Sequence, residues 1–340
     1  MMQVHQNFQL RNYNTFGVAA IAKQFATFAS VAELEELLSM PRIASINSHP
    51  LILGGGSNVL FTTDCLLVLK NEIPGITIEK EDNDYVYVRA GAGESWHNLV
   101  LYCVNKNFGG IENLSLIPGS AGASPIQNIG AYGVELQDVF HQLNAFHLKE
   151  KQIVSFNAVA CEFGYRQSIF KEKYRNLFVI LDLTIKLRKS PLYNTSYVAL
   201  QKELERMMVR QLSVDIISKA VINIRKLKLP DPKVTGNAGS FFKNPEISLK
   251  AYEQLLQRFP AINAFLMPNG LYKVAAGWLT EQCGFKGFRK GDAGCYHNQA
   301  LVLVNYGEAT GQEIFSLSEE IIQAVFHKFN VILQREVNII

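Results

Sequence analysis

Residues 51 to 61 read Leu-Ile-Leu-Gly-Gly-Gly-Ser-Asn-Val-Leu-Phe. A short apolar run enters a triple glycine and leaves through Ser57 and Asn58 into further apolar residues, which predicts a strand, a tight turn and a second strand. Successive amides in such a turn can bind an anion such as a phosphate. The turn is not a Rossmann fingerprint, because the sixth position from Gly54 is Val59, where that motif requires a glycine. Short strands and helices mix along the rest of the chain, which predicts an α+β fold rather than a doubly wound sheet.

A second glycine-rich stretch runs from Ile117 to Gly133 and reads Ile-Pro-Gly-Ser-Ala-Gly-Ala-Ser-Pro-Ile-Gln-Asn-Ile-Gly-Ala-Tyr-Gly. It carries four glycines, two prolines and almost no charge. Small residues let a backbone lie against a large planar ligand. A loop of this length with little periodicity is typically functional or disordered, and its isoleucines and Tyr132 argue against disorder.

A third stretch, residues 236 to 245, reads Gly-Asn-Ala-Gly-Ser-Phe-Phe-Lys-Asn-Pro. It places Ser240 between flexible glycines and two aromatic residues that can exclude water. A glycine–serine pair alone is typical of ordinary turns, so this serine becomes a candidate only together with the other two stretches.

Composition limits the function classes. The chain has 340 residues, enough for two or three domains, and its net charge of +3 is too small to indicate nucleic acid binding. It contains no apolar run of 18 residues, and its first residues lack an apolar signal core, so we expect neither a membrane span nor a secreted protein but a cytoplasmic one. Five cysteines without a close pair predict reduced thiols and no metal site.

Periodicity and capping residues place the main elements. They predict a helix after Ser30, with Glu33 completing a capping box, and a helix after Ser95 that ends near Gly109. Two further helices are predicted before Leu229-Pro230 and around Ile314. Strands are predicted at 178–185 and 331–340.

Together the three stretches resemble the UDP-N-acetylenolpyruvoylglucosamine reductases of bacterial cell-wall synthesis. The resemblance extends from Asn14-Thr-Phe-Gly17 to Arg335-Glu-Val337. Further matching segments, in the same order, are Arg89-Ala-Gly-Ala-Gly93, Phe163-Gly-Tyr-Arg-Gln-Ser168, Leu229-Pro-Asp-Pro-Lys233, Ala275-Ala-Gly-Trp-Leu279 and Asn298-Gln-Ala-Leu301. Several independent motifs in one order make this resemblance specific.

The resemblance implies a two-part FAD-binding region of the vanillyl-alcohol-oxidase type, followed by a C-terminal α+β substrate domain. The expected parts are residues 1–75 with the terminal strand 331–340, residues 76–225, and the substrate domain 226–330. FAD is expected to bind without a covalent bond. The expected FAD contacts are Gly54, Gly55, Gly56, Ser57, Asn58, Pro118, Gly119, Ser120, Gly122, Ala123, Ser124, Ile126, Asn128, Gly130 and Gly133.

The resemblance also implies the reaction. NADPH reduces FAD, and N5 of the reduced flavin passes a hydride to UDP-N-acetylglucosamine enolpyruvate, giving UDP-N-acetylmuramate for peptidoglycan. Ser240 is expected to give the proton, Arg166 to grip the substrate carboxylate, and Glu336 to act either as an acid or as an orienting carboxylate. Without the resemblance, Arg166 would be read as an ordinary surface arginine. Glu336 would be read as a solvated carboxylate on a strand or as the partner of a neighbouring arginine. No protein partner is implied.

Substrate contacts are expected from Tyr197, Lys228, Asn244 and Gln299, and Tyr193 competes with Tyr197 as the tyrosine that closes over the substrate. The chain ends four residues after Glu336. Two other functions stay open. A flavin oxidase on the same scaffold would keep the glycine loops without needing the full catalytic trio, and a non-catalytic protein that binds a UDP-sugar or flavin would need no proton donor.

Overall fold

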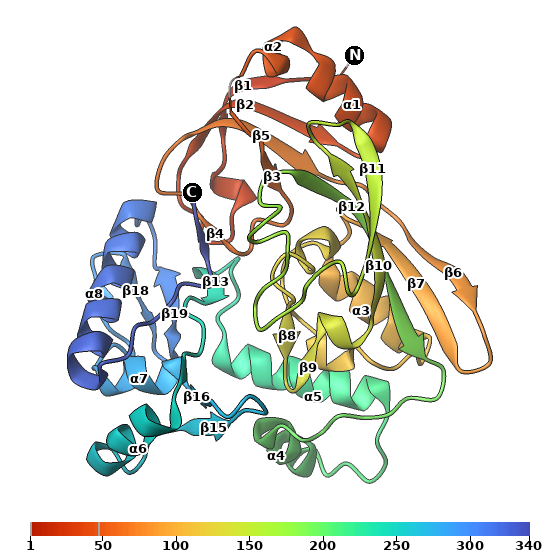
Figure 1. Cartoon of the computed structure of the whole chain (residues 1–340). Coiled ribbons are helices and arrows are strands. Elements are labelled where there is room, and N and C mark those ends of the chain that lie inside the picture. The colour runs from red at the N-terminus through yellow and green to blue at the C-terminus, as the bar shows by residue number, and fades with distance from the viewer. Residues whose placement is uncertain (1, 47) are drawn as a thin grey trace. The chain divides into compact units, whose positions relative to one another are not determined.

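The computed structural model describes residues 2–46 and 48–340 (Figure 1). Contacts divide the chain into two compact units. The first unit comprises Met1–Phe8, Ile21–Gly56 and Cys65–Lys226, and the second comprises Gln9–Ala20, Ser57–Asp64 and Leu227–Ile340. The division into three parts expected from the sequence stays a prediction.

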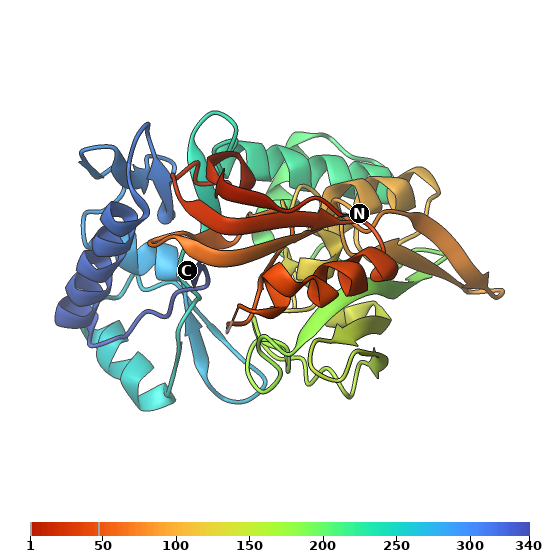
Figure 2. The same cartoon turned by 90° about the horizontal axis from the view of Figure 1, so that it is seen from above.

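A largely parallel sheet begins the first unit. Its strands are β1 (His5–Gln9), β2 (Ile21–Phe28), β5 (Cys65–Asn71) and β3 (Leu51–Leu53), in that spatial order. Both β2 and β3 pair with β5 in parallel. Helices α1 (Val31–Ser39) and α2 (Pro41–Ala44) follow β2, and α1 runs along this sheet with Leu34 and Leu37 buried against it (Figure 2).

The start of α1 corrects one prediction. Ser30 caps the helix, because its Oγ accepts a hydrogen bond from the Glu33 amide at 3.2 Å. The Glu33 carboxylate, however, accepts from the Ala29 amide at 2.6 Å. The predicted reciprocal capping box is therefore wrong in its second half, because the glutamate side chain reaches one residue further back.

An antiparallel sheet forms the larger part of the first unit. Its strands are β11 (Gln152–Asn157), β10 (Phe140–His147), β12 (Phe178–Arg188), β7 (Tyr85–Gly91) and β6 (Ile76–Glu81), in that order. One face packs against α3 (Trp96–Asn105), with Trp96 and Leu99 fully buried beside Val88 and Leu183. The remaining elements of this unit are η2 (Glu112–Leu114), η3 (Ala121–Ala123), β8 (Gly130–Ala131), β9 (Val134–Glu135), η4 (Leu136–Asp138), α4 (Val198–Arg206) and α5 (Val214–Lys228).

The cap of α3 by Ser95 is confirmed, but the predicted end near Gly109 is wrong. The helix ends at Asn105 because Asn107 adopts the left-handed conformation, with φ of 57°. The Phe108 amide then bonds to the Cys103 carbonyl at 2.9 Å, which is the pattern that ends many helices.

The second unit carries the C-terminal part of the chain. Its main sheet has the order β13-β19-β18-β17, and α8 lies beside β18 and β19 (Figure 1). A smaller sheet has the order β14-β16-β15. The elements are η1 (Arg11–Tyr13), β4 (Val59–Leu60), β13 (Gly236–Ser240), β14 (Glu246–Ile247), α6 (Leu249–Arg258), β15 (Ala264–Leu266), β16 (Tyr272–Val274), α7 (Ala276–Gln282), β17 (Arg289–Lys290), β18 (Ala293–Tyr296), β19 (Gln299–Asn305), α8 (Gly311–Phe329) and β20 (Asn338–Ile339).

The predicted terminal strand 331–340 is wrong in extent. Only β20 forms a strand there, parallel to β4, and Arg335 makes an isolated antiparallel bridge to Phe242. The chain changes partner at the buried residue Val337, which interrupts the ladder. The apolar residues do alternate, but successive parts of the segment pair with two different partners: Arg335 bridges to Phe242, and β20 pairs with β4.

Two further features bear on function. Among residues 2–46 and 48–340, no helix combines the length and the apolar character needed to cross a bilayer. Burial raises the pKa of Cys103, Cys161 and Cys295 to about 12, so these thiols stay protonated at neutral pH.

Candidate active site

The two glycine-rich stretches of the first unit lie in direct backbone contact. A Cβ atom placed on Gly55 would lie 2.8 Å from Cα of Gly119, and one on Gly54 would lie 2.1 Å from Oγ of Ser120. Gly56 and Gly119 have positive φ of 63° and 111°, which side chains disfavour. Only glycine at Gly54 and Gly55 permits this approach.

The turn also has a nearby positive charge. Lys70 on β5 donates a hydrogen bond from Nζ to the Gly54 carbonyl at 3.3 Å. The next residues, Ser57 and Asn58, belong to the second unit, because the chain passes between the units after Gly56. A lysine beside a glycine turn suits an anionic ligand such as a diphosphate.

The loop 117–133 is anchored from behind by backbone bonds. The Ala121 amide donates to the Glu94 carbonyl at 2.7 Å, and the Gly122 amide donates to the Ala92 carbonyl at 2.9 Å. Asn128 is fully buried, and its side chain bonds to Glu135, the Gly164 carbonyl and the Gln137 amide. Its side chain therefore holds the loop in place.

The expected FAD contacts in this loop divide by burial. Ser120, Gly122, Ser124 and Asn128 are buried, whereas Pro118, Ala123, Ile126 and Gly133 are exposed, and Gly119 and Gly130 lie between. The exposed members can meet a ligand directly, and the buried ones shape the loop that presents them.

Arg166 is docked on this loop. Its Nη2 donates to the Gly130 carbonyl at 2.5 Å, its Nη1 lies 3.5 Å from the Asn128 carbonyl, and Glu135 is 3.9 Å away. Only 17% of the Arg166 side chain is exposed, and its φ is 54°. The guanidinium is thus not that of an ordinary surface arginine, because loop carbonyls and a carboxylate fix its plane.

The candidate tyrosines differ in exposure. Tyr197 directly precedes α4, is 45% exposed, and meets the Tyr132 ring edge-on at 5.3 Å. Tyr193 is partly buried against the hydrophobic core. An exposed ring can close over a ligand without leaving a core cavity, so this geometry favours Tyr197 over Tyr193.

Several residues that position this region were missed from the sequence. Asn113 donates to the carbonyls of Tyr132 and Asn194 at 2.8 and 2.9 Å, and Asn194 donates to the Gly133 carbonyl at 2.9 Å. These bonds tie the tyrosine segment to the loop 117–133. Their only sequence signal is that Asn113 and Asn194 stand near the glycine-rich and tyrosine segments.

Arg225 was also missed. It lies on α5, donates from Nε to the Leu116 carbonyl at 3.1 Å, and hydrogen-bonds Tyr132. Burial raises the pKa of Tyr132, so its hydroxyl is neutral where it bonds Arg225. An arginine in an amphipathic helix is typical of a solvated face, so the position of Arg225 in the chain did not single it out.

In the second unit, Ser240 ends β13 and is exposed, with Phe241 and Phe242 buried behind it. Glu336 lies on the neighbouring backbone, because its amide donates to the Phe241 carbonyl at 2.8 Å. The Asn58 side chain donates to the Glu336 carbonyl at 3.2 Å, and the Asn338 amide donates to the Asn58 carbonyl at 3.1 Å. The structure thus brings Ser240 and Glu336 onto adjacent backbone segments.

The expected substrate residues of this unit gather around the start of α7. Asn244 accepts a hydrogen bond from the Ala276 amide at 2.9 Å, and a Cβ on Gly277 would lie 2.8 Å from Oε1 of Gln299. Lys228 ends α5 and is exposed. Its neighbour Leu227 accepts a bond from Asn298, next to Gln299.

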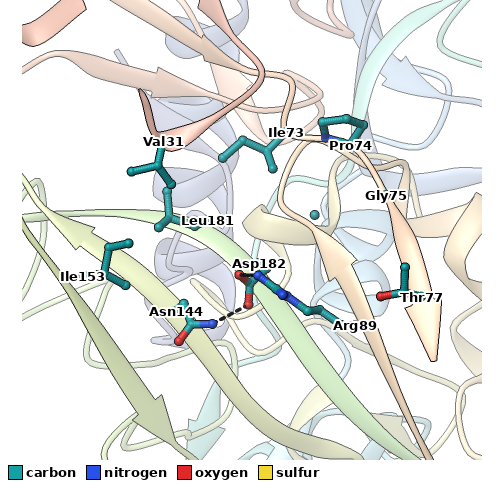
Figure 3. A pocket seen from close by; sticks show the side chains of 11 residues that line it. Val31, Ile73, Pro74, Gly75, Thr77, Arg89, Asn144, Ile153, Leu181 and Asp182 are labelled. Carbon is teal, nitrogen blue, oxygen red and sulfur yellow. Dashed lines mark hydrogen bonds and ion pairs between the residues drawn. The ribbon is translucent and has the colours of Figure 1, made fainter. Parts of the chain in front are cut away.

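A cavity of about 350 Å³ lies elsewhere in the first unit (Figure 3). Asp182 pairs there with Arg89 at 2.6 Å and accepts from Asn144 at 2.9 Å. Asp182 faces away from its neighbour Leu183, which packs in the core beneath the loop 117–133. The cavity therefore opens on the opposite face of the sheet, and the Arg89 charge is neutralised within it.

Known families match both parts of the chain. The FAD binding domain family matches residues 23–152, and the UDP-N-acetylenolpyruvoylglucosamine reductase C-terminal domain matches residues 231–340. The UDP-N-acetylenolpyruvoylglucosamine reductase of Flavobacterium johnsoniae is 47% identical over 341 aligned residues, and the alignment covers 100% of both chains. The chain belongs to the UDP-N-acetylenolpyruvoylglucosamine reductase family.

Other members of this family agree. The reductase of Amoebophilus asiaticus is 46% identical with 100% of both chains covered, and that of Pseudomonas fluorescens is 42% identical with 99% of both covered. With the FAD binding domain, these matches confirm the predicted family, the FAD cofactor and an FAD-dependent oxidoreductase.

Solved structures agree on the fold. The UDP-N-acetylenolpyruvylglucosamine reductase of Thermus caldophilus aligns with a TM-score of 0.66 at 22% identity, covering 100% of this chain and 99% of that one. The 6-hydroxy-D-nicotine oxidase of Arthrobacter nicotinovorans aligns with a TM-score of 0.51 at 11% identity, covering 98% and 87%. The predicted α+β class, with an FAD-binding region and a C-terminal domain, is confirmed.

Proposed function

We propose that this chain reduces UDP-N-acetylglucosamine enolpyruvate to UDP-N-acetylmuramate for peptidoglycan synthesis, with NADPH as the reductant. The observation that carries the proposal is the exposed hydroxyl of Ser240, one residue from the backbone bond that holds Glu336, within the reductase C-terminal domain. We place this reaction in the cytoplasm, where NADPH would be available to the enzyme.

The first unit fits FAD. Gly54 and Gly55 lie so close to Gly119 and Ser120 that any side chain there would clash with the loop 117–133, and Lys70 adds positive charge beside the turn. The exposed residues Pro118, Ala123 and Ile126 of the loop 117–133 can contact a ring directly. When bound, FAD would supply the chemistry that transfers a hydride from NADPH to the terminal carbon of the enol ether.

Addition of hydride to the terminal carbon leaves negative charge on the neighbouring carbon and its carboxylate. We assign the carboxylate to Arg166, whose fixed guanidinium suits two parallel hydrogen bonds. Ser240 gives its proton to the carbon, and solvent returns a proton to the serine. Glu336 would stabilise the developing charge from the adjacent backbone segment.

We further propose that Tyr197 closes over the substrate, and that Lys228, Asn244 and Gln299 bind its nucleotide. The exposure of Tyr197 and the clustering of Asn244 and Gln299 at the start of α7 support these roles. The parts 1–75 with 331–340, 76–225 and 226–330 are proposed as the domain division.

Substitution of Ser240 tests the proposal. In Ser240→Ala, NADPH should still bleach the flavin absorbance, because that half-reaction involves no proton transfer to carbon. Reoxidation by the enolpyruvyl substrate should slow by about 100- to 10,000-fold, the range for loss of a general acid.

Ser240→Cys offers a control of similar size that retains a proton donor and should recover part of the rate. Equal slowing of both half-reactions in Ser240→Ala would mean that Ser240 shapes the site and gives no proton. Rapid reoxidation of the reduced flavin by oxygen, with no reoxidation by the enolpyruvyl substrate, would favour a flavin oxidase instead.

A further inference from the structure

The strand that presents Ser240 carries a β-bulge. Asn237 pairs with Val304 and Ser240 pairs with Val302, so Ala238 and Gly239 together oppose Leu303 alone. An unbroken ladder would set Ser240 opposite Leu301, on the other face of the sheet. The extra residue therefore decides on which face the Ser240 hydroxyl emerges, a common use of bulges beside active sites.

The bulge depends on a left-handed residue. Gly239 has φ of 69°, and its backbone amide is turned out of the ladder. This amide donates instead to Oδ1 of Asn237 at 2.9 Å. The same asparagine donates from Nδ2 to the carbonyls of Pro230 and Thr235 at 3.1 and 2.9 Å.

Asn237 is 2% exposed, and its own amide donates to the Thr15 carbonyl at 2.9 Å. Its side chain thus faces one amide with its oxygen and two carbonyls with its nitrogen. No other residue type supplies one acceptor and two donors in this planar arrangement except the longer glutamine.

The rest of the strand is fixed on both sides of the bulge. A Cβ on Gly236 would lie 2.1 Å from the Phe16 carbonyl, and the Phe241 ring meets the Phe16 ring at 6.2 Å. A change at Asn237 therefore cannot be absorbed by a shift of the whole strand. It must be absorbed between Ala238 and Ser240.

We infer that Asn237 is the positioning residue for Ser240: by holding the Gly239 amide it maintains the bulge that turns the Ser240 hydroxyl toward the substrate carbon. The inference rests on the proposed role of Ser240 as proton donor. It adds a residue that touches neither substrate nor flavin but sets the direction from which the proton arrives.

The face of the carbon to which the proton is delivered can be read from the stereochemistry of the product. The carbon that receives the proton carries a hydrogen, a methyl group, a carboxylate and the ether oxygen in the product, so it is a stereocentre. A correctly placed serine delivers the proton to one face only. A displaced serine leaves the charged carbon to be protonated by water from either face.

Two variants perturb the bulge in different ways. Asn237→Ala removes the acceptor for Gly239 and both donors. Gly239→Ala leaves Asn237 intact and meets no atom within 4 Å, so it strains only the left-handed backbone. Gly291→Ala is the matched control, because Gly291 has φ of 61° and equally open space in the turn between β17 and β18.

The experiment follows both half-reactions of the FAD-loaded enzyme by stopped flow and measures the epimer ratio of the product by chiral chromatography. In Asn237→Ala and Gly239→Ala, reoxidation by substrate should slow by about 100-fold, as expected for a displacement of roughly 1 Å. Reduction by NADPH and KM for the substrate should not change, and a second epimer should appear. Gly291→Ala should match the parent in every readout.

The possible outcomes distinguish a failure of the Asn237 role from a failure of the proposed proton-donor role of Ser240. If Ser240→Ala reoxidises at the parent rate, the proton-donor role itself fails. If Ser240→Ala is slow while both bulge variants keep the parent rate and a single epimer, only the role of Asn237 is overturned. Equal slowing of both half-reactions in the bulge variants would also overturn it, because that is the effect of general damage. Should Asn237→Ala fail to fold, Gly239→Ala decides the question alone.

Discussion

Adding a methyl group to Gly54 should force apart the two glycine-rich stretches that we assign to FAD. The new Cβ would lie 2.1 Å from Oγ of Ser120 but 3.3 Å from its Cβ. Overpacking of this kind costs about 1–3 kcal/mol, and a gain of about 0.4–1 kcal/mol from the stiffer unfolded chain offsets part of it. We therefore expect Gly54→Ala to lose about 1–2 kcal/mol of unfolding free energy.

Ser120→Ala removes the clashing oxygen and provides the matched partner. The double variant Gly54→Ala/Ser120→Ala should recover most of the loss, because only the 3.3 Å contact then needs to relax by a few tenths of an ångström. The coupling free energy from the double-mutant cycle should be about 1–2 kcal/mol, within the usual range for residues in contact.

The assay is denaturant unfolding of the four proteins, combined with FAD titration of the apoproteins. FAD affinity should fall about tenfold in Gly54→Ala for each ~1.4 kcal/mol lost at the site, and the double variant should bind FAD as tightly as Ser120→Ala alone does. A cycle with no coupling would refute the contact between the two stretches. Coupling in stability without any change in FAD affinity would refute their joint role in binding the cofactor.

Other expected outcomes concern the tyrosine segment and the chain end. Tyr197→Ala should raise the substrate Kd more than Tyr197→Phe, with little change in the chemical step, because a closing ring contributes contact area as well as a hydroxyl. Substrate titration of the reduced enzyme checks this, and the same phenotype in Tyr193→Ala alone would reverse our choice of tyrosine. Deletion of residues 337–340 removes the buried Val337 anchor, worth about 1.5–3 kcal/mol, and the β20–β4 pairing. FAD should still bind, while substrate-driven reoxidation falls towards that of Glu336→Ala in stopped flow. A parent rate in the deletion would mean that the bond from the Glu336 amide to Phe241 suffices.

Local patterns in the sequence predicted local structure well. The strand–turn–strand at 51–61 and the Ser95 cap depend on neighbouring residues, and both are found. The end of α3 was misplaced because asparagine enters the left-handed region less often than glycine, so Asn107 gave a weak stop signal.

Features that depend on distant partners could not be predicted. The terminal segment alternates as a strand should, but its pairing changes from Phe242 to Val59 within a few residues. Ser240 was found by its motif, whereas the bulge that orients it arises from the register with β19. Likewise, Arg225 looks like any helical arginine until the fold brings it to Tyr132 and Leu116.

The proposed function is tested most directly by an absorbance spectrum of the purified protein in an anaerobic cuvette. We expect the yellow bands of FAD, bleaching of these bands on addition of NADPH, and their return only when UDP-N-acetylglucosamine enolpyruvate is added. The product released should be UDP-N-acetylmuramate, in an amount equal to the NADPH consumed. A protein that binds no flavin, or whose reduced flavin is not reoxidised by this substrate, would contradict the proposed function.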